Sequence, residues 1–152
     1  MNSAANHLWL ACAGDGKLVP TDPCSLSMPS GLESGDQLVE MLAGSARVLR
    51  DAGAERVVIL DPETNAQMSF KTARSRVTGE TLLALAAAQS NIPCERASRA
   101  QVRSVLGLSR SGRLSSLVQT VVVTPLSPYW RDKRDLAALA ALSVTGAVDA
   151  EG

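Results

Sequence analysis

The chain has 152 residues, of which 45% are hydrophobic and 3% aromatic, and its formal net charge is zero. A chain of this length can bury one core but is short for two, and with few rings that core must be packed from small aliphatic side chains. The neutral chain lacks the strong basic excess of many DNA-cleaving proteins, and it has no segment apolar enough to span a membrane. We therefore expect a single cytoplasmic domain over residues 1–146 and a frayed tail over residues 147–152.

Charge is divided unevenly along the chain. Residues 1–70 carry four basic and nine acidic side chains, a charge of −5, whereas residues 71–152 carry eleven basic and six acidic ones, a charge of +5. An arginine-rich part suits contacts with phosphate oxygens, and a solvated helical face is the alternative. The arginines that we consider as nucleic-acid ligands are Arg74, Arg76, Arg99, Arg103, Arg110 and Arg113.

The first predicted element is a β-hairpin. The apolar run over residues 7–13 has the length of a strand, and it ends at a Gly-Asp-Gly turn signal centred on Asp15. A second short run follows over residues 17–19. The Pro- and Ser-rich stretch after it has room for a third short strand around residues 24–28.

The next part of the chain predicts a helix and then a buried strand. Apolar side chains recur at helical spacing over residues 32–52, and Gly53 ends the pattern. Residues 56–60 form a β-branched run without alternation, as expected of a strand that helices cover on both faces. Asp61 and Pro62 follow directly, so the Asp61 carboxylate is predicted at the C-terminal end of that strand. Opening a turn is the alternative role for Asp61.

Further elements are predicted in the middle of the chain. Residues 63–77 are polar and are expected to be irregular, and a Leu- and Ala-rich helix is expected over residues 78–90. Residues 92–97 are a candidate strand. Ser98 is a candidate N-cap of a short helix that Gly107 closes.

The last part of the chain predicts one ambiguous element and one helix. Residues 114–123 suit either a helix or a strand. Ser127 and Pro128 place an N-cap and a first-turn proline before a helix that runs to about Val144. The whole order predicts an α/β fold in which an N-terminal hairpin leads into a mixed sheet with helices on both faces.

Asp132 and Asp135 stand three residues apart at the start of this last helix, so we expect them on one helical face. The same line continues through Leu139 and Leu142, which would direct both acids toward the sheet. Charged groups directed inward cost free energy unless they are paired, hydrogen-bonded or bound to metal. Together with Asp61, the two acids could hold Mg²⁺ or Mn²⁺, which prefer carboxylate oxygens. The alternative is that they only stabilise the helix N-terminus.

These features resemble the bacterial Holliday-junction resolvase branch of the ribonuclease-H-like superfamily. The likeness rests on the hairpin, on the acid after a middle strand, and on an acid-x-x-acid pair that opens a small-apolar helix over residues 132–140. The resemblance implies that Asp61, Asp132 and Asp135 are catalytic ligands of Mg²⁺ or Mn²⁺. It also implies that the helix over residues 99–106 meets the nucleic-acid backbone, and that the chain is a metal-dependent endonuclease acting on structured or branched DNA.

The first strand departs from that family, which has an acid on it. Residues 10–14 contain none, and Asp15 follows one residue later inside the turn. As a fourth catalytic and metal-binding residue, Asp15 would complete the site, whereas as a turn residue it would leave the site short of a ligand. The alternative function is a catalytically inactive ribonuclease-H-like module that binds nucleic acid or protein.

A small-molecule enzyme has less support. The chain has no Gly-rich phosphate loop, and its only histidine, His7, lies in the first strand without a credible nucleophile beside it. The three cysteines lack the spacing of a disulfide framework or a zinc site. Ala-rich helices often pack closely between subunits, so we expect that the chain can form a homodimer. We do not expect it to bind a membrane.

Overall fold

The structure is a computed structural model. It describes the backbone of residues 1–4, 7–21, 23, 25–27, 33–63, 66–122 and 130–151, and the side chains of the same residues except 2–4 and 146–151. Cys24, which belongs to a predicted strand, and Ser127 and Pro128, which belong to a predicted helix start, lie outside the described residues.

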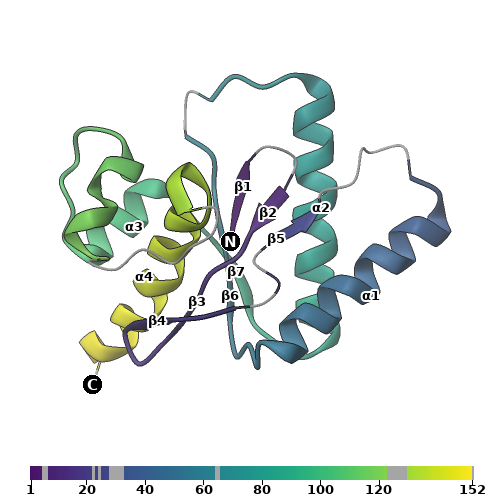
Figure 1. The fold of residues 1–152 in the computed structure, drawn as a ribbon, viewed down its shortest axis with the longest axis horizontal. Helices are drawn as coiled ribbons and strands as arrows, with labels where there is room; N and C mark the ends of the chain where they lie inside the picture. The colour runs from purple at the N-terminus through teal and green to yellow at the C-terminus, as the bar shows by residue number, and fades with distance from the viewer. Residues whose placement is uncertain are drawn as a thin grey trace.

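The elements follow one another in the order shown in Figure 1. The strands are β1 (Asn2–Ala4), β2 (His7–Trp9), β3 (Cys12–Gly14), β4 (Lys17–Val19), β5 (Ser25–Ser27), β6 (Val57–Leu60) and β7 (Cys94–Ala97). The helices are α1 (Gly35–Asp51), α2 (Phe70–Gln89), α3 (Arg99–Leu106), the 3-10 helix η1 (Leu114–Thr120), an irregular turn η2 (Trp130–Arg134) and α4 (Asp135–Glu151).

Short strands lie side by side through the centre of the molecule. β2 pairs antiparallel with β1 and with β5, whereas β6 and β7 pair in parallel. Met1 connects the two groups, because its nitrogen donates to the Val58 oxygen at 2.6 Å and its oxygen accepts from the Leu60 nitrogen at 2.9 Å. β1 therefore runs beside β6, and parallel and antiparallel pairs are mixed, as predicted.

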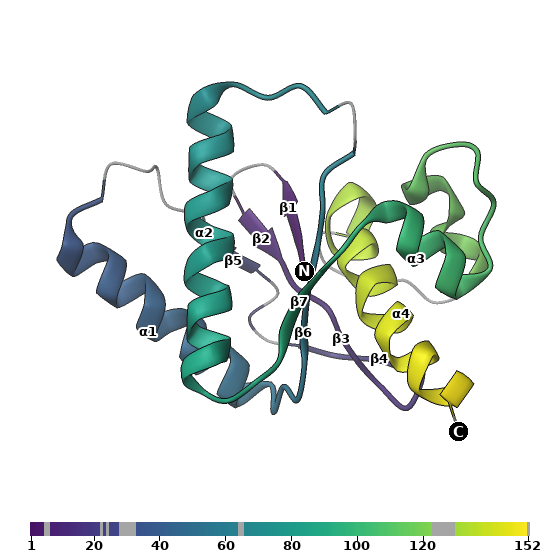
Figure 2. The same ribbon diagram turned by 180° about the vertical axis from the view of Figure 1, so that it is seen from behind.

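Helices cover both faces of these strands (Figures 1 and 2). All four residues of β6 are buried, and their side chains alternate between two cores. Val57 and Ile59 pack with Leu83 of α2 and other residues of α1 and α2. Val58 and Leu60 pack on the other face, against α3, η1 and α4. The predicted α/β fold class, with helices on both faces of a mixed sheet, is confirmed.

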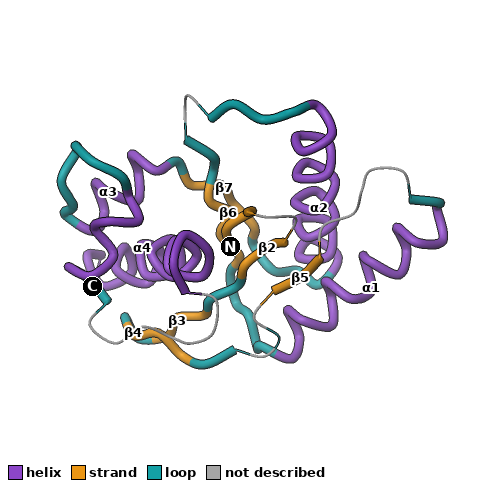
Figure 3. Tube along the Cα trace, turned by 45° about the horizontal axis from the view of Figure 1, so that its top comes forward, coloured by secondary structure: helices purple, strands orange, loops and turns teal. Residues whose placement is uncertain are grey.

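The predicted hairpin is confirmed as β3 and β4. Gly14 pairs with Lys17, and the two residues between them, Asp15 and Gly16, have φ angles of 52° and 73°. Positive φ at both central positions is the geometry that favours Asp-Gly in two-residue turns. The apolar run before the turn is divided into β2 and β3, and β1 was not predicted at all. Figure 3 shows the hairpin beside α4, away from β5 and α1.

The start of α2 differs from the prediction. α2 begins at Phe70, so the prediction of an irregular segment is wrong for residues 70–77. Ser69 caps the helix, since its side-chain oxygen accepts a hydrogen bond from the Thr72 nitrogen at 3.1 Å. The first two turns are polar and exposed in large part, so they show no apolar period. This extension places Arg74 and Arg76 on a helix.

α3 agrees with its predicted caps. Ser98 forms a reciprocal capping box with Gln101, and Gly107 ends the helix at a φ of 65°. The ambiguous segment that follows is a 3-10 helix over Leu114–Thr120, and Val123 lies outside the described residues. Among the described residues, no helix is both long and apolar enough to cross a membrane.

The start of α4 corrects a second prediction. α4 begins at Asp135, and the backbone leaves helical angles at Arg131 (ψ 130°) and at Asp132 (φ 55°). Asp132 therefore precedes the helix, and the prediction that Asp132 and Asp135 share a helical face is wrong. The helix also continues to Glu151, beyond its predicted end near Val144.

Candidate functional site

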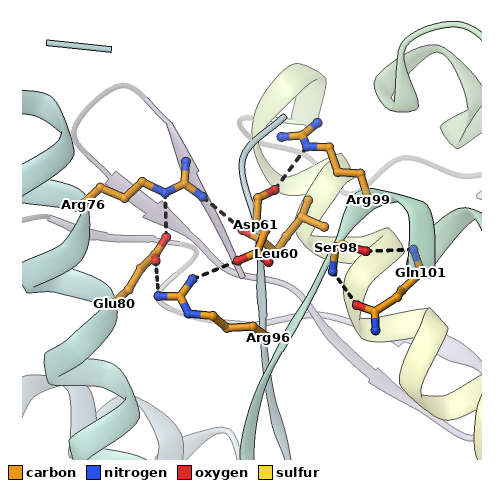
Figure 4. A network of polar contacts seen from close by, with 8 residues as sticks. All are labelled: Leu60, Asp61, Arg76, Glu80, Arg96, Ser98, Arg99 and Gln101. Atoms are coloured by element: carbon orange, nitrogen blue, oxygen red, sulfur yellow. Dashed lines mark hydrogen bonds and ion pairs between the residues drawn. The ribbon is translucent and has the colours of Figure 1, made fainter. Parts of the chain in front are cut away.

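The C-terminal end of β6 presents Asp61, as predicted, but the carboxylate is paired with an arginine. Oδ1 of Asp61 lies 3.1 Å from Nη1 of Arg96. Arg96 comes from β7, which lies beside β6 in parallel register with Ile59 opposite Arg96. The two side chains are partly exposed, at 38% for Asp61 and 50% for Arg96. Figure 4 shows the pair within a larger polar network.

Glu80 of α2 is the buried acid of this network. Its side chain is 2% exposed, and both of its oxygens are bound by arginines. Oε1 lies 2.8 Å from Nε of Arg76, one helical turn away, and Oε2 lies 2.6 Å from Nη2 of Arg96. A buried carboxylate requires such partners because desolvation penalises an unpaired charge. The hydrogen bond to Glu80 is the main reason why the pKa of Arg96 is raised.

Arginines also bind the main-chain oxygens at this end of β6. Nη2 of Arg76 donates to the Leu60 oxygen at 3.0 Å, and Nε of Arg99 donates to the Asp61 oxygen at 3.2 Å. Arg99 also lies 3.7 Å from Glu63. Burial lowers the pKa of the Arg99 guanidinium, and the nearby charges of Glu63 and Asp132 act in the opposite direction. The charge of Asp132, an exposed residue, thus raises the pKa of Arg99.

We call this network the arginine clamp, and define it as Arg76, Arg96 and Arg99 with Asp61, Glu63 and Glu80. Its three positive charges balance its three negative charges. The clamp joins β6, β7, α2 and the start of α3 at one end of the strands (Figure 4). The site is therefore a neutral set of ion pairs with no surplus of negative charge.

Asp135 is buried at 3% exposure, but its carboxylate binds backbone nitrogens. Oδ1 accepts from the Lys133 nitrogen at 2.8 Å and from the Leu136 nitrogen at 2.7 Å, and Oδ2 accepts from the Asp132 nitrogen at 3.0 Å. The first N–H groups of a helix have no carbonyl partner within it, and the Asp135 carboxylate accepts from such groups at the start of α4. Burial raises the pKa of Asp135, while the three hydrogen bonds counteract the shift. Asp135 therefore holds the turn before α4.

Asp15 lies at the opposite end of β6 from Asp61. It lines a hollow with Ala54, Arg56 and Val57, at the N-terminal end of that strand. Figure 1 shows the β3–β4 turn near the C-terminus of the chain, whereas the chain that follows β6 leaves at the other end. Arg99 thus links Asp61, whose main-chain oxygen it binds, with the charge of Asp132, whereas Asp15 lies at the other end of β6.

β1, which lies along the edge of β6 opposite to β7, supplies no acid either. The predicted first strand was the run that ends at Asp15, whereas the strand in this place is β1. No aspartate or glutamate occurs anywhere in residues 1–14. Among the described residues, no three His, Cys, Asp or Glu side chains come together as a metal site. Asp61, Glu80 and Asp135 do not fit a divalent cation, because guanidinium groups or backbone nitrogens already bind oxygens of each carboxylate.

The arginines predicted to bind nucleic acid have different environments. Arg76 and Arg99 belong to the clamp, and Arg103 donates to the main-chain oxygens of Ser109, Ser111 and Gly112. The other three are exposed, and they are Arg74 on α2 and Arg110 and Arg113 on the loop between α3 and η1.

Three residues of the clamp, Glu63, Glu80 and Arg96, were missed as site residues. Arg76 and Glu80 stand four residues apart, a spacing that indicates an ion pair once the segment is known to be helical. Phe70 was also missed. It is 78% exposed at the start of α2, and the guanidinium of Arg74 lies 5.7 Å from its ring centre. Its only signal is a lone phenylalanine in a polar segment.

Comparison with known proteins identifies solved structures with the same fold. No protein-family model and no curated protein sequence matches the chain. Among solved structures, the chain is similar to RuvC of Thermus thermophilus, with a TM-score of 0.69 and 15% identity over 99% of this chain and 93% of that one. It is also similar to Thermus thermophilus RuvC in complex with a Holliday junction substrate, with a TM-score of 0.59 and 13% identity over 83% and 77% of the two chains. The chain thus has the ribonuclease-H-like fold of RuvC, which confirms the resemblance inferred from its sequence.

Proposed function

We propose that this chain, which has the RuvC fold, binds branched DNA without cleaving it. The arginine clamp is the observation that carries the proposal. Metal-dependent phosphodiester hydrolysis needs carboxylates that are available to divalent ions. Here the Asp61 carboxylate binds Arg96, and the Asp135 carboxylate binds backbone nitrogens. A scaffold of this kind can retain a DNA surface after losing the ion site.

The fold supports DNA as the ligand. One of the similar structures contains a Holliday junction substrate, and its likeness extends over 83% of this chain. The exposed Arg110 and Arg113 lie three residues apart on one loop, where they can contact successive phosphates. These two arginines are the first candidates for contacts with the DNA backbone.

The start of α2 supports a single-stranded or unpaired element in that DNA. Phe70 is 78% exposed, and Lys71 and Arg74 are exposed beside it. An exposed ring flanked by positive charges suits stacking on an unpaired base while the cations hold the backbone. A branch point offers unpaired or distorted bases, which an intact duplex does not.

A metal-dependent endonuclease is the second candidate, and one observation favours it. Glu63 and Asp132 both lie near Arg99, whose Nε binds the Asp61 main-chain oxygen. Glu63 and Asp132 are therefore two further acids near Arg99, which contacts the residue at the end of β6. For cleavage with Mg²⁺ or Mn²⁺, the arginines would have to leave these acids when DNA binds.

The decisive experiment compares binding and cleavage on the same DNA. Fluorescence anisotropy measures binding to a four-way junction and to a duplex of equal length, in EDTA and in Mg²⁺ or Mn²⁺. We expect tighter binding to the junction, equal affinity with and without metal, and intact DNA on a denaturing gel. Cleavage that Asp61→Asn abolishes would establish the nuclease instead, and a lack of junction binding would refute both candidates.

A matched pair of variants locates the DNA surface. Arg110→Gln/Arg113→Gln removes two exposed arginines three residues apart, and Arg47→Gln/Arg50→Gln removes two with the same spacing on α1. The first change is expected to lower the slope of log affinity against log salt by about 2, because about one counterion is released for each phosphate contact. The change on α1 should leave the slope unaltered.

The homodimer and the cytoplasmic location stay predictions. Light scattering of the purified chain tests the first, since a dimer has twice the mass of the monomer. Fractionation of the native cells tests the second.

A further inference from the structure

We infer that Arg96 takes the place of a divalent cation at the end of β6, because its guanidinium binds the carboxylates of Asp61 and Glu80 and excludes metal from both. The inference rests on the proposed function, which is DNA binding without cleavage. It deepens that proposal by giving a reason why the chain does not cleave DNA.

One guanidinium contacts both acids. Nη1 of Arg96 lies 3.1 Å from Asp61, and Nη2 of the same group lies 2.6 Å from Glu80. The two carboxylates therefore lie on either side of one planar cation. A divalent ion that neutralised both carboxylates would occupy the same place. The arginine is permanently charged, so this neutralisation persists at every physiological pH.

The register of the strands directs Arg96 to this position. Side chains alternate along β7, so Arg96 and Glu95 point to opposite faces. Glu95 pairs with Arg56 at 2.7 Å, and both side chains are about half exposed. The pair formed by Arg56 and Glu95 thus resembles the pair of Arg96 and Asp61 in exposure and strand origin, but it has no buried acid. It provides a matched control.

Charge explains what the loss of Arg96 would do. The clamp is neutral with three arginines, and without Arg96 its acids exceed its arginines by one. Glu80 would keep Arg76 on Oε1, and its Oε2 would lose Arg96. Asp61 would lose the same partner. Two carboxylates that share an excess negative charge favour a hard divalent cation.

The experiment titrates Mn²⁺ into the full chain without DNA and follows free Mn²⁺ by electron paramagnetic resonance. The wild-type chain and Arg56→Gln are expected to show no saturable uptake. Arg96→Gln should bind about one Mn²⁺ with a dissociation constant on the order of 10⁻³ M, as expected of a site with few ligands. Adding Asp61→Asn to Arg96→Gln should weaken that binding at least about tenfold.

Circular dichroism confirms that each variant is folded. If Arg96→Gln is unfolded, Arg96→Met replaces it, because its unbranched side chain fills similar space and also lacks the charge. Mn²⁺ uptake by Arg96→Met is expected at the same concentration as by Arg96→Gln. Uptake by the wild-type chain that depends on Asp61 would overturn the inference, and so would no uptake by a folded Arg96 variant.

Failure of this inference differs from failure of the proposed function. Junction binding and cleavage are measured with DNA, whereas the Mn²⁺ titration contains none. Mn²⁺ uptake by the wild-type chain together with intact junction DNA would refute the role of Arg96 alone. If the wild-type chain takes up no Mn²⁺ and does not bind junction DNA, the proposed function alone is refuted.

Discussion

The C-terminal end of β6 and the start of α4 both carry acids that the sequence predicts as metal ligands, and the two regions withdraw them from metal by different means. At the end of β6, Asp61 is bound by the side chain of Arg96. At the start of α4, Asp135 is bound by three backbone nitrogens. A side-chain partner can be removed by one substitution, whereas a backbone partner remains whatever the residue. One substitution can therefore free Asp61 from its partner, whereas a substitution of Asp135 would only disturb the turn before α4.

The largest expected effect breaks the clamp from its buried side. Glu80→Gln keeps the shape of the side chain but leaves Arg76 and Arg96 without the anion that both contact. We expect a loss of about 3 kcal/mol in the free energy of unfolding, because removing one partner of a buried ion pair strands the other charges. Urea denaturation measures it.

Glu95→Gln is the control for this variant, since it breaks an ion pair of half-exposed side chains. Its loss should stay below about 1 kcal/mol. Equal losses for the two variants would mean that the clamp stabilises no more than a surface pair.

The next largest effect concerns the turn before α4. Asp135→Ala removes the acceptor of three backbone N–H groups, of which the Leu136 nitrogen is buried. We expect a loss of about 2 kcal/mol in the free energy of unfolding. Asp135→Asn keeps one oxygen and should lose less than half as much. An Asp135→Ala chain as stable as wild type would show that the turn does not depend on this carboxylate.

A smaller effect is expected on DNA binding at the start of α2. Phe70→Ala removes an exposed ring and should weaken junction binding about fivefold, the lower range for one stacked base. Its thermal stability should be unchanged. Val77→Ala is the matched control, since Val77 is 59% exposed on the same helix and carries no ring. Equal affinity of both variants for the junction would remove Phe70 from the DNA surface.

The smallest effect is the pH dependence that Asp135 contributes. Because burial raises its pKa, the folded chain binds this proton at a higher pH than the unfolded chain does. Its contribution to stability therefore increases as pH falls from the folded pKa toward the ordinary aspartate value, and is constant below that value. Urea unfolding between pH 7 and pH 4 should show wild type gaining stability relative to Asp135→Asn. A constant or shrinking difference would contradict the raised pKa.

The fold was predictable where the signals were local. Asp15 and its flanking glycines specify a tight turn, and Ser98 with Gly107 brackets α3. The β-branched run at β6 indicates a strand buried on both faces. The start of α2 was missed because Ser69 caps a polar segment in which helical period is not visible.

The candidate site was less predictable because its contacts are distant in sequence. Asp61 stands out by its place after a strand, but Arg96 lies 35 residues away and meets it only through the register of β6 and β7. Glu80 joins them only because α2 packs on that sheet. For Asp135, the spacing to Asp132 suggested a helical face, and the backbone hydrogen bonds that break this face leave no mark in the sequence.

Arg103 carries a consequence of its own. Its guanidinium binds three main-chain oxygens of the loop that displays Arg110 and Arg113. Fixing a flexible loop costs conformational entropy, and here that cost is met during folding and not when a ligand arrives. In the proposed complex with DNA, Arg103 would thus affect how tightly Arg110 and Arg113 bind phosphate through preorganisation alone.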